Sequence, residues 1–130
     1  LFPYTTLFRS SAQAVVNYFQ KHDGIIFISV MNNMSIDCDC VAHPQPVKLK
    51  DYGILASTDP VALDQACVDA CMKAKPLPGS QLAENLGKKG FVDHHDHFKN
   101  SRPESEWRSC LEHAEKIGLG TREYELIVVK

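Results

Sequence analysis

The 130-residue sequence lacks the features that mark several large functional classes. It has no basic stripe and a net charge of −2, so nothing in it favours a nucleic-acid partner. Its longest apolar run, GIIFISVM, is far shorter than the roughly 18 residues that span a bilayer, so we expect no membrane partner. It also has no glycine-rich phosphate loop and no GxSxG nucleophile elbow. These absences exclude the commonest sequence signatures of nucleotide binding and serine hydrolysis.

The sequence also lacks a readable secretory signal, and its five cysteines are an odd number. Cys38 and Cys40 are separated by one residue, which is too close for an easy mutual disulfide. Reduced thiols are typical of the cytoplasm, where cysteines serve as metal ligands or as small core residues. We therefore predict a cytoplasmic protein with free thiols.

The first ten residues, LFPYTTLFRS, resemble the translated reading frame of a common short-read sequencing adaptor. We interpret residues 1–10 as an adaptor-derived artefact and exclude them from the fold. Residues 11–130 are then the C-terminal part of a domain whose N-terminal part is missing.

Hydrophobic periodicity predicts alternating helices and strands in residues 11–130. Helices are expected from residue 11 to near residue 21, over residues 59–72, over residues 81–86, and through residues 107–117 before Gly118. Asp59 is predicted to cap the second helix, Pro60 suits its first turn, and Pro76 prevents its continuation. Apolar runs predict strands at residues 25–31, 52–57 and 124–129. This order predicts an α/β fold with a mostly parallel sheet and flanking helices, incomplete at its N-terminus.

The segment MSIDCDCVAH is the strongest candidate for a metal site. In an extended chain the side chains of Cys38 and Cys40 would point to one face and those of Asp37 and Asp39 to the other. Two thiolates form half of a soft-metal site for zinc or an iron–sulfur cluster, and His43 could supply a third ligand. The alternative is a loop whose thiols only pack.

Two other groups of metal-binding residue types are better explained structurally. Cys67 and Cys71 lie four residues apart on a predicted helix face with aliphatic neighbours, and Cys110 lies between Trp107 and Leu111, so packing is expected for all three. The run DHHDH contains Asp93, His94, His95, Asp96 and His97 and would bind zinc or nickel adventitiously. We expect these histidines to lie in a surface excursion without a specific function.

The segments DCDC, YGILASTDPVALDQACVDA and EHAEKIGLGTREYELI together resemble the C-terminal part of the domain-of-unknown-function 362 (DUF362) family, which comprises uncharacterised iron–sulfur centre proteins. The resemblance implies that Asp37, Cys38, Asp39 and Cys40 form the acidic-cysteine motif of the family. It further implies that Asp59, Pro60 and Asp64 form its strand-to-helix motif. Longer members carry two CxxCxxCxxxC runs upstream that bind 4Fe–4S clusters, and no such run occurs here.

The resemblance implies a fragment of an iron–sulfur protein that acts in redox chemistry or electron transfer. Its expected partners are its own missing ferredoxin-like N-terminal region and redox proteins, and its expected cofactors are 4Fe–4S clusters and a metal ion at the Cys-Asp-Cys loop. A metal-dependent enzyme is one alternative, with an ion at that loop polarising a substrate near the helix that starts at Asp59. The other alternative is a structural domain that binds a partner and no metal.

Overall fold

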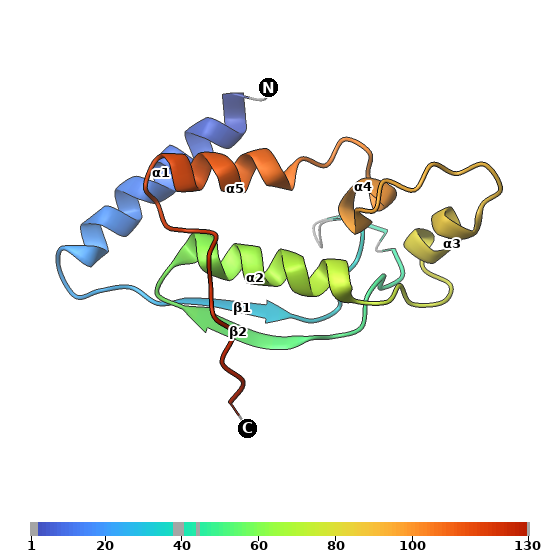
Figure 1. Ribbon diagram of the computed structural model, residues 1–130, viewed down its shortest axis with the longest axis horizontal. Coiled ribbons are helices and arrows are strands. Elements are labelled where there is room, and N and C mark those ends of the chain that lie inside the picture. Colours follow the sequence, from blue (N-terminus) through green and yellow to red (C-terminus); the bar gives the residue numbers. More distant parts are fainter. Residues whose placement is uncertain (1–2, 38–40, 44, 130) are drawn as a thin grey trace. The chain divides into compact units, whose positions relative to one another are not determined.

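The computed structural model describes residues 3–37, 41–43 and 45–129, and these residues contain five helices and two strands (Figure 1). The elements, in chain order, are α1 (Pro3–Gln20), β1 (Phe27–Met31), β2 (Gly53–Ser57), α2 (Pro60–Lys73), α3 (Gln81–Gly87), α4 (His97–Ser101) and α5 (Trp107–Lys116). The prediction of a fold that mixes helices with strands is therefore confirmed. No described helix has the length and apolar character needed to cross a membrane.

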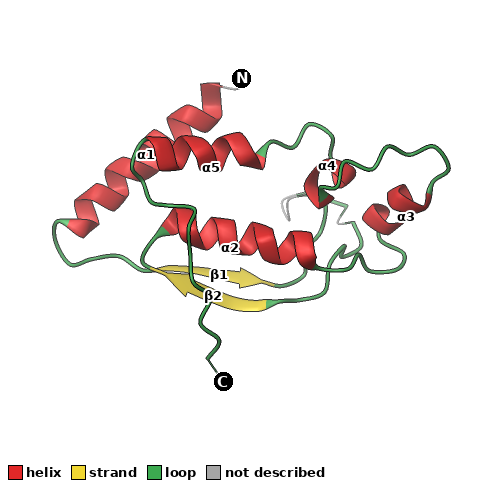
Figure 2. Ribbon diagram, in the orientation of Figure 1, coloured by secondary structure: helices red, strands yellow, loops and turns green. Residues whose placement is uncertain are grey.

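The predicted parallel sheet is not observed in the described part of the chain. β1 and β2 form a two-stranded antiparallel sheet, and their arrows point in opposite directions in Figure 2. Parallel neighbours need a long crossover, usually a helix, to return the chain to the same end of the sheet. The described residues between β1 and β2 form no helix, so the chain turns back and the two strands run in opposite directions.

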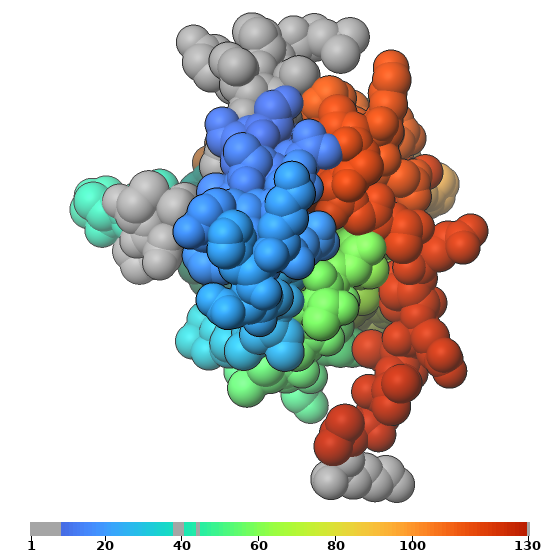
Figure 3. Space-filling model, turned by 90° about the vertical axis from the view of Figure 1, so that its left-hand side faces the viewer, coloured from blue at the N-terminus to red at the C-terminus, as the bar shows by residue number. Residues whose placement is uncertain are grey.

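The third predicted strand is also wrong. Residues 124–129 have no strand partner, and Ile127, Val128 and Val129 are 76%, 75% and 90% exposed. The apolar, β-branched composition of this segment favours a strand, but composition cannot supply a neighbouring edge with which to pair. In Figure 3 this segment, in red, extends away from the residues that precede it in the chain.

The chain divides into two compact units. Unit 1 comprises Leu1–Ser29, Ile54–Val68 and Glu106–Lys130, and unit 2 comprises Val30–Gly53 and Asp69–Ser105.

The core of unit 1 forms where α1, α5 and the first half of α2 meet. Its fully buried residues are aliphatic, and Phe27 of β1 packs against them, so the start of α2 shares a core with the sheet. α1 lies along α5, and their blue and orange atoms are in direct contact in Figure 3. The buried members of this core are Val16, Val61, Leu111, Ala114 and Leu119.

α1 begins earlier than predicted and includes part of the adaptor-like segment. Pro3 suits a first helical turn, and no glycine or second proline interrupts the residues that follow. Arg9 forms an ion pair with Asp64 at 3.1 Å and donates from Nε to Cys110 Sγ at 3.0 Å. The origin of residues 1–10 stays a prediction.

One row of the sheet in unit 1 faces solvent. Ile26 and Ile28, which flank the core residue Phe27, are 64% and 61% exposed, and Ile54 of β2 is 71% exposed. Side chains alternate between the faces of a strand, so burying Phe27 turns its neighbours outward. The sheet therefore has one covered face and one bare aliphatic face in this unit.

Unit 2 is stabilised by short helices and by an isolated β-bridge. Leu49 and Leu82 are fully buried, and Leu49 forms an isolated antiparallel bridge with Pro76. α3 packs against α4. Each of these helices begins at a buried polar cap: Ser80 accepts from Ala83 N, and Asp96 accepts from Phe98 N and Lys99 N.

Candidate functional site

The predicted metal loop is described only at its edges. Cys38, Asp39 and Cys40 lie outside the described residues, so their predicted role as ligands stays a prediction. Asp37 and His43 are described. His43 is exposed, whereas Asp37 is largely covered and pairs with the guanidinium of Arg102. No group of three or more histidine, cysteine or acidic side chains that could hold a metal occurs among residues 3–37, 41–43 and 45–129.

The Arg102 ion pair changes what Asp37 can do. The charge-assisted hydrogen bond engages one carboxylate oxygen and fixes the side chain, while the other oxygen keeps its lone pairs. Ser35 supports the adjacent backbone, because its hydroxyl donates to the Asp37 carbonyl at 2.7 Å. These contacts position the chain next to the Cys-Asp-Cys motif in sequence, and the role of Asp37 as a ligand stays a prediction.

Backbone hydrogen bonds fix the segments that flank the motif. The Lys48 N–H donates to the Met34 carbonyl, and the Leu77 N–H donates to the Lys48 carbonyl, both at 2.8 Å. Nearer the strands, the Asn33 N–H donates to Asp51 Oδ1 at 2.9 Å. Hydrogen bonds therefore connect the segment before the motif to the segment after it, and connect the latter to the chain that follows α2.

Lys48 is a buried cation that sequence analysis did not identify. The residue is 7% exposed, and its Nζ lies 5.2 Å from the centre of the Phe98 ring. Burial lowers the pKa of Lys48, and the nearby Cys71 thiol opposes that shift. No carboxylate pairs with Lys48 within the described part of the chain. Lysine is rarely buried without a partner, but nothing in the local sequence QPVKLKD distinguishes this lysine from Lys50.

Cys71 and Cys67 have different surroundings although both lie on α2. Cys71 is buried in unit 2, and its thiol donates to the Met34 thioether with a sulfur–sulfur distance of 3.6 Å. Cys67 is half-buried in unit 1. Burial raises the pKa of Cys67, the hydrogen bond with Ser29 opposes that rise, and Asp64 adds to it. Both are free thiols, as is Cys110. Packing explains Cys67, whereas Cys71 also contacts a second sulfur.

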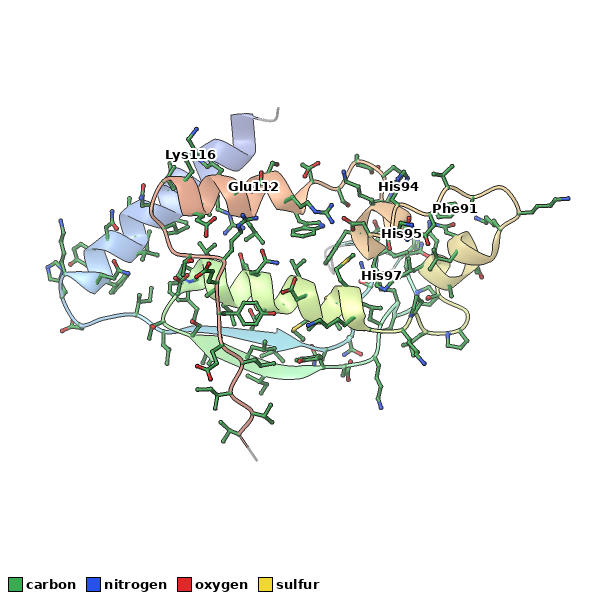
Figure 4. All side chains as sticks on the ribbon, in the orientation of Figure 1. Phe91, His94, His95, His97, Glu112 and Lys116 are labelled. Atoms are coloured by element: carbon green, nitrogen blue, oxygen red, sulfur yellow. The ribbon has the colours of Figure 1, made fainter. Side chains whose placement is uncertain are left out.

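The acidic residues of the DHHDH run organise the backbone at the start of α4, where Figure 4 labels the three histidines of the run. Asp96 is 1% exposed and caps the helix. The buried Asn100 accepts from the His94 N–H at 2.9 Å and donates to Asp93 Oδ1 at 2.7 Å. That donation is the main cause of the lowered pKa of Asp93.

The three histidines of the run differ in their contacts. His97 Nε2 lies 2.9 Å from the Ala74 carbonyl oxygen, and this contact holds the ring in place. The His95 side chain is 91% exposed and lies 3.5 Å from an Asp93 oxygen. A side chain this exposed has no rigid frame for a metal ion. The arrangement thus has a clear structural role at the start of α4.

Asp59 joins two parts of unit 1 at the start of α2. Its Oδ1 accepts from the N–H groups of Val61 and Ala62 at 2.8 and 3.0 Å, which confirms the predicted cap. Its Oδ2 accepts from the Thr121 N–H at 2.9 Å. Gly120 lies so close that an added Cβ would overlap the Asp59 carboxylate. The contact with Thr121 was not predicted, because no local pattern links residues so distant in sequence.

These features define a class of protein: a mixed helix–strand chain in which a strand leads into an aspartate-capped helix, with a Cys-Asp-Cys motif earlier in the sequence. Residues 6–69 match the family model described as "Domain of unknown function (DUF362)". The match covers 64 of the 130 residues, and over this stretch it confirms the predicted resemblance to the DUF362 family. The match contains both the Cys-Asp-Cys and the strand-to-helix motifs and ends before the third quoted segment. No curated protein and no solved structure matches the chain.

Proposed function

We propose that the protein is an iron–sulfur-associated redox or electron-transfer protein in which the Cys-Asp-Cys loop binds a metal ion. The observation that carries this proposal is the DUF362 match over residues 6–69, which includes Asp37, Cys38, Asp39 and Cys40. The free thiols of Cys67, Cys71 and Cys110 fit a reducing compartment.

The residues of this sequence do not fit a 4Fe–4S cluster by themselves. Such a cluster takes four cysteine thiolates in one place, typically from a CxxCxxCxxxC run, and the sequence contains no such run. We therefore assign the clusters of the intact protein to a ferredoxin-like region upstream of the motifs described here. No step of the proposed redox function is assigned to the described residues.

The donor set of the loop suits a single soft ion better than a cluster. Two cysteines provide half of a tetrahedral zinc site, and a third and fourth ligand must come from elsewhere. Asp37, Asp39 and His43 are the candidates, and Asp37 would bind through the oxygen that Arg102 does not contact. The fixed segments around Met34 and Lys48 support the proposal, because a metal loop needs a rigid base.

The alternative of an enzyme with a substrate at the start of α2 lacks structural support. Both Asp59 carboxylate oxygens accept backbone N–H groups, so the side chain already occupies the positive end of the helix. An anionic substrate would have to displace this cap. We assign the strand-to-helix motif a structural role.

The test is metal and sulfide analysis of the complete gene product, purified without oxygen. We expect iron and acid-labile sulfide in stoichiometric amounts, with visible iron–sulfur absorbance, and one further metal ion that is lost in the Cys38→Ser plus Cys40→Ser variant. Cys110→Ser is the matched control and should retain all metal. A complete sequence without a four-cysteine run, or a protein without iron, would contradict the redox proposal. Retention of the further ion by the double variant would contradict the loop assignment.

A further inference from the structure

Residues 124–129, which we call the tail, have the composition of a strand but no strand partner. Their sequence, YELIVV, is rich in the β-branched and aromatic residues that favour strands. They form no strand or bridge with the described part of the chain, and Leu126 and Val128 are 50% and 75% exposed. An apolar segment of this kind can pair with the open edge of a sheet.

The sheet has the complementary surface. Among the described residues β1 and β2 pair only with each other, so each strand keeps one open edge. Ile26, Ile28 and Ile54 form the bare aliphatic row on its exposed face. A strand added to an edge would place β-branched side chains beside this row, and such neighbours stabilise a sheet. A two-stranded sheet is marginal by itself, so a third strand has much to contribute.

The start of the tail is fixed at a point from which the chain leaves its own sheet. The Thr121 N–H donates to Asp59 Oδ2 at 2.9 Å, and Arg122 Nε donates to Glu115 Oε2 at 3.0 Å. Beyond these contacts the chain runs across the direction of β2 and away from it, as the red segment in Figures 1 and 3 shows. The tail therefore does not lie along an edge of its own sheet, whereas the same edge of a second copy is open to it.

We propose that two copies of this chain form a symmetric pair in which the tail of each copy adds a strand to the sheet of the other. Each copy supplies one tail and one open sheet, so the exchange closes after two molecules. The net charge of −2 is small, and the row carries no charged side chain, so electrostatic repulsion between the copies is weak. The pair does not depend on the Cys-Asp-Cys motif, because no residue of that motif takes part.

The experiment is sedimentation equilibrium of the 130-residue chain over a range of concentrations. We expect the mass to rise from the 14.5 kDa monomer to a limit of twice that value. Val128→Glu and Ile54→Glu should each weaken association at least tenfold, because each places a charge in the apolar contact. Val92→Glu is the matched control, since Val92 is 69% exposed but belongs to unit 2, and it should associate like the wild type. At the lowest concentrations all four proteins should be monomers with similar melting temperatures.

Hydrogen exchange of residues 125–129 gives a second readout that needs no variant. Their amides should exchange rapidly in the monomer and become protected as the mass rises, because strand addition supplies hydrogen bonds across the new edge. A dimer in which these amides stay unprotected would show that the copies meet through the row alone, and the inference would be wrong. Unchanged association in Val128→Glu, or a mass that grows without limit, would also overturn it.

The complete gene product distinguishes a second copy from an upstream part of the same chain. A dimer with protected amides at residues 125–129 would support the exchange. A complete product that stays monomeric at every concentration would assign the cover of the sheet to its own upstream region and would contradict the proposed pair.

Discussion

Asp59 and Thr121 are 62 residues apart in sequence, and the Asp59 carboxylate accepts the Thr121 backbone N–H at 2.9 Å. The same carboxylate caps α2 through its other oxygen. One side chain thus stabilises a helix start and fixes the chain after α5. This dual role makes Asp59 the most informative position for stability measurements in unit 1.

We expect Asp59→Ala to lower the free energy of unfolding by about 1–2 kcal/mol, since loss of an N-cap typically costs that much. Asp59→Asn should cost less, because the amide oxygen can still accept from Val61 and Ala62. The amide NH₂ would face the Thr121 N–H and cannot accept from it, so the variant loses only that hydrogen bond. Urea denaturation of the three proteins gives the order. Equal losses in both variants would show that the cap contributes little.

Gly120→Ala should lower the free energy of unfolding by roughly 1–3 kcal/mol, because the new Cβ overlaps the Asp59 carboxylate. Gly87→Ala is the control, since its Cβ would meet no atom within 4 Å. Thermal melting compares the two. In the Asp59→Ala background the cost of Gly120→Ala should fall, and a cost that is unchanged there would contradict the steric explanation.

Truncation after Glu123 should leave the melting temperature almost unchanged. Residues 124–129 have no strand partner among the described residues, and Ile127, Val128 and Val129 expose most of their surface already. Their removal forfeits little burial, while the anchors at Thr121 and Arg122 remain. Differential scanning calorimetry of the truncated and intact proteins measures the effect. A fall of several degrees in the melting temperature would support the predicted strand at residues 124–129.

Asn100→Ala should destabilise unit 2 by about 1–3 kcal/mol, because it leaves buried polar groups without their partners. Its side-chain amide bridges Asp93 and the His94 N–H, and both bonds are lost, whereas the bond from Asn85 Nδ2 to the Asn100 backbone carbonyl stays. His95→Ala removes a solvent-exposed ring and should stay within about 0.5 kcal/mol of the wild type. Chemical denaturation tests both. A larger cost for His95→Ala than for Asn100→Ala would assign the histidine a role that its exposure does not suggest.

Glu115 should titrate below the ordinary range of a glutamate. The Arg122 backbone N–H and then the Arg122 side chain hold the pKa of Glu115 down. A pKa that is depressed in the folded state contributes stability above the unfolded-state pKa, and this stability is lost as the pH falls through the folded value. Carboxylate chemical shifts measured by NMR against pH should show the low midpoint. Arg122→Ala should raise it only in part, because the backbone N–H stays, and an unchanged midpoint in that variant would exclude the arginine side chain as a cause.

Local patterns predicted four of the five described helices and several of their ends, and they missed only α4, which lies in the expected surface excursion. The capping aspartate and Pro60 gave the start of α2, and Gly118 gave the end of α5, because these signals act within one helical turn. The sheet was predicted less well. Strand direction and the pairing of residues 124–129 depend on which edges meet in space, and apolar composition carries no such information.

In the candidate site, too, local sequence patterns predicted some features, whereas others depend on tertiary contacts. The Cys-Asp-Cys motif is visible in sequence, because its spacing has a direct chemical meaning. Lys48, Met34 and Cys71 could not be grouped in advance, since their proximity arises from tertiary contacts between distant segments. Arg102 likewise meets Asp37 across 65 residues. The motif is therefore visible in the sequence, whereas the contacts of Met34, Asp37 and Lys48 arise only in the folded chain.

The bare aliphatic row formed by Ile26, Ile28 and Ile54 has a practical consequence for handling the protein. Exposed rows of β-branched side chains on short sheets promote self-association, and native proteins usually cover them. Samples of this chain should therefore scatter more light as concentration rises, and added salt should worsen the effect, because salt strengthens hydrophobic contacts and screens the small net charge. Dilute, low-salt buffers are the conditions in which the measurements above will report on individual molecules.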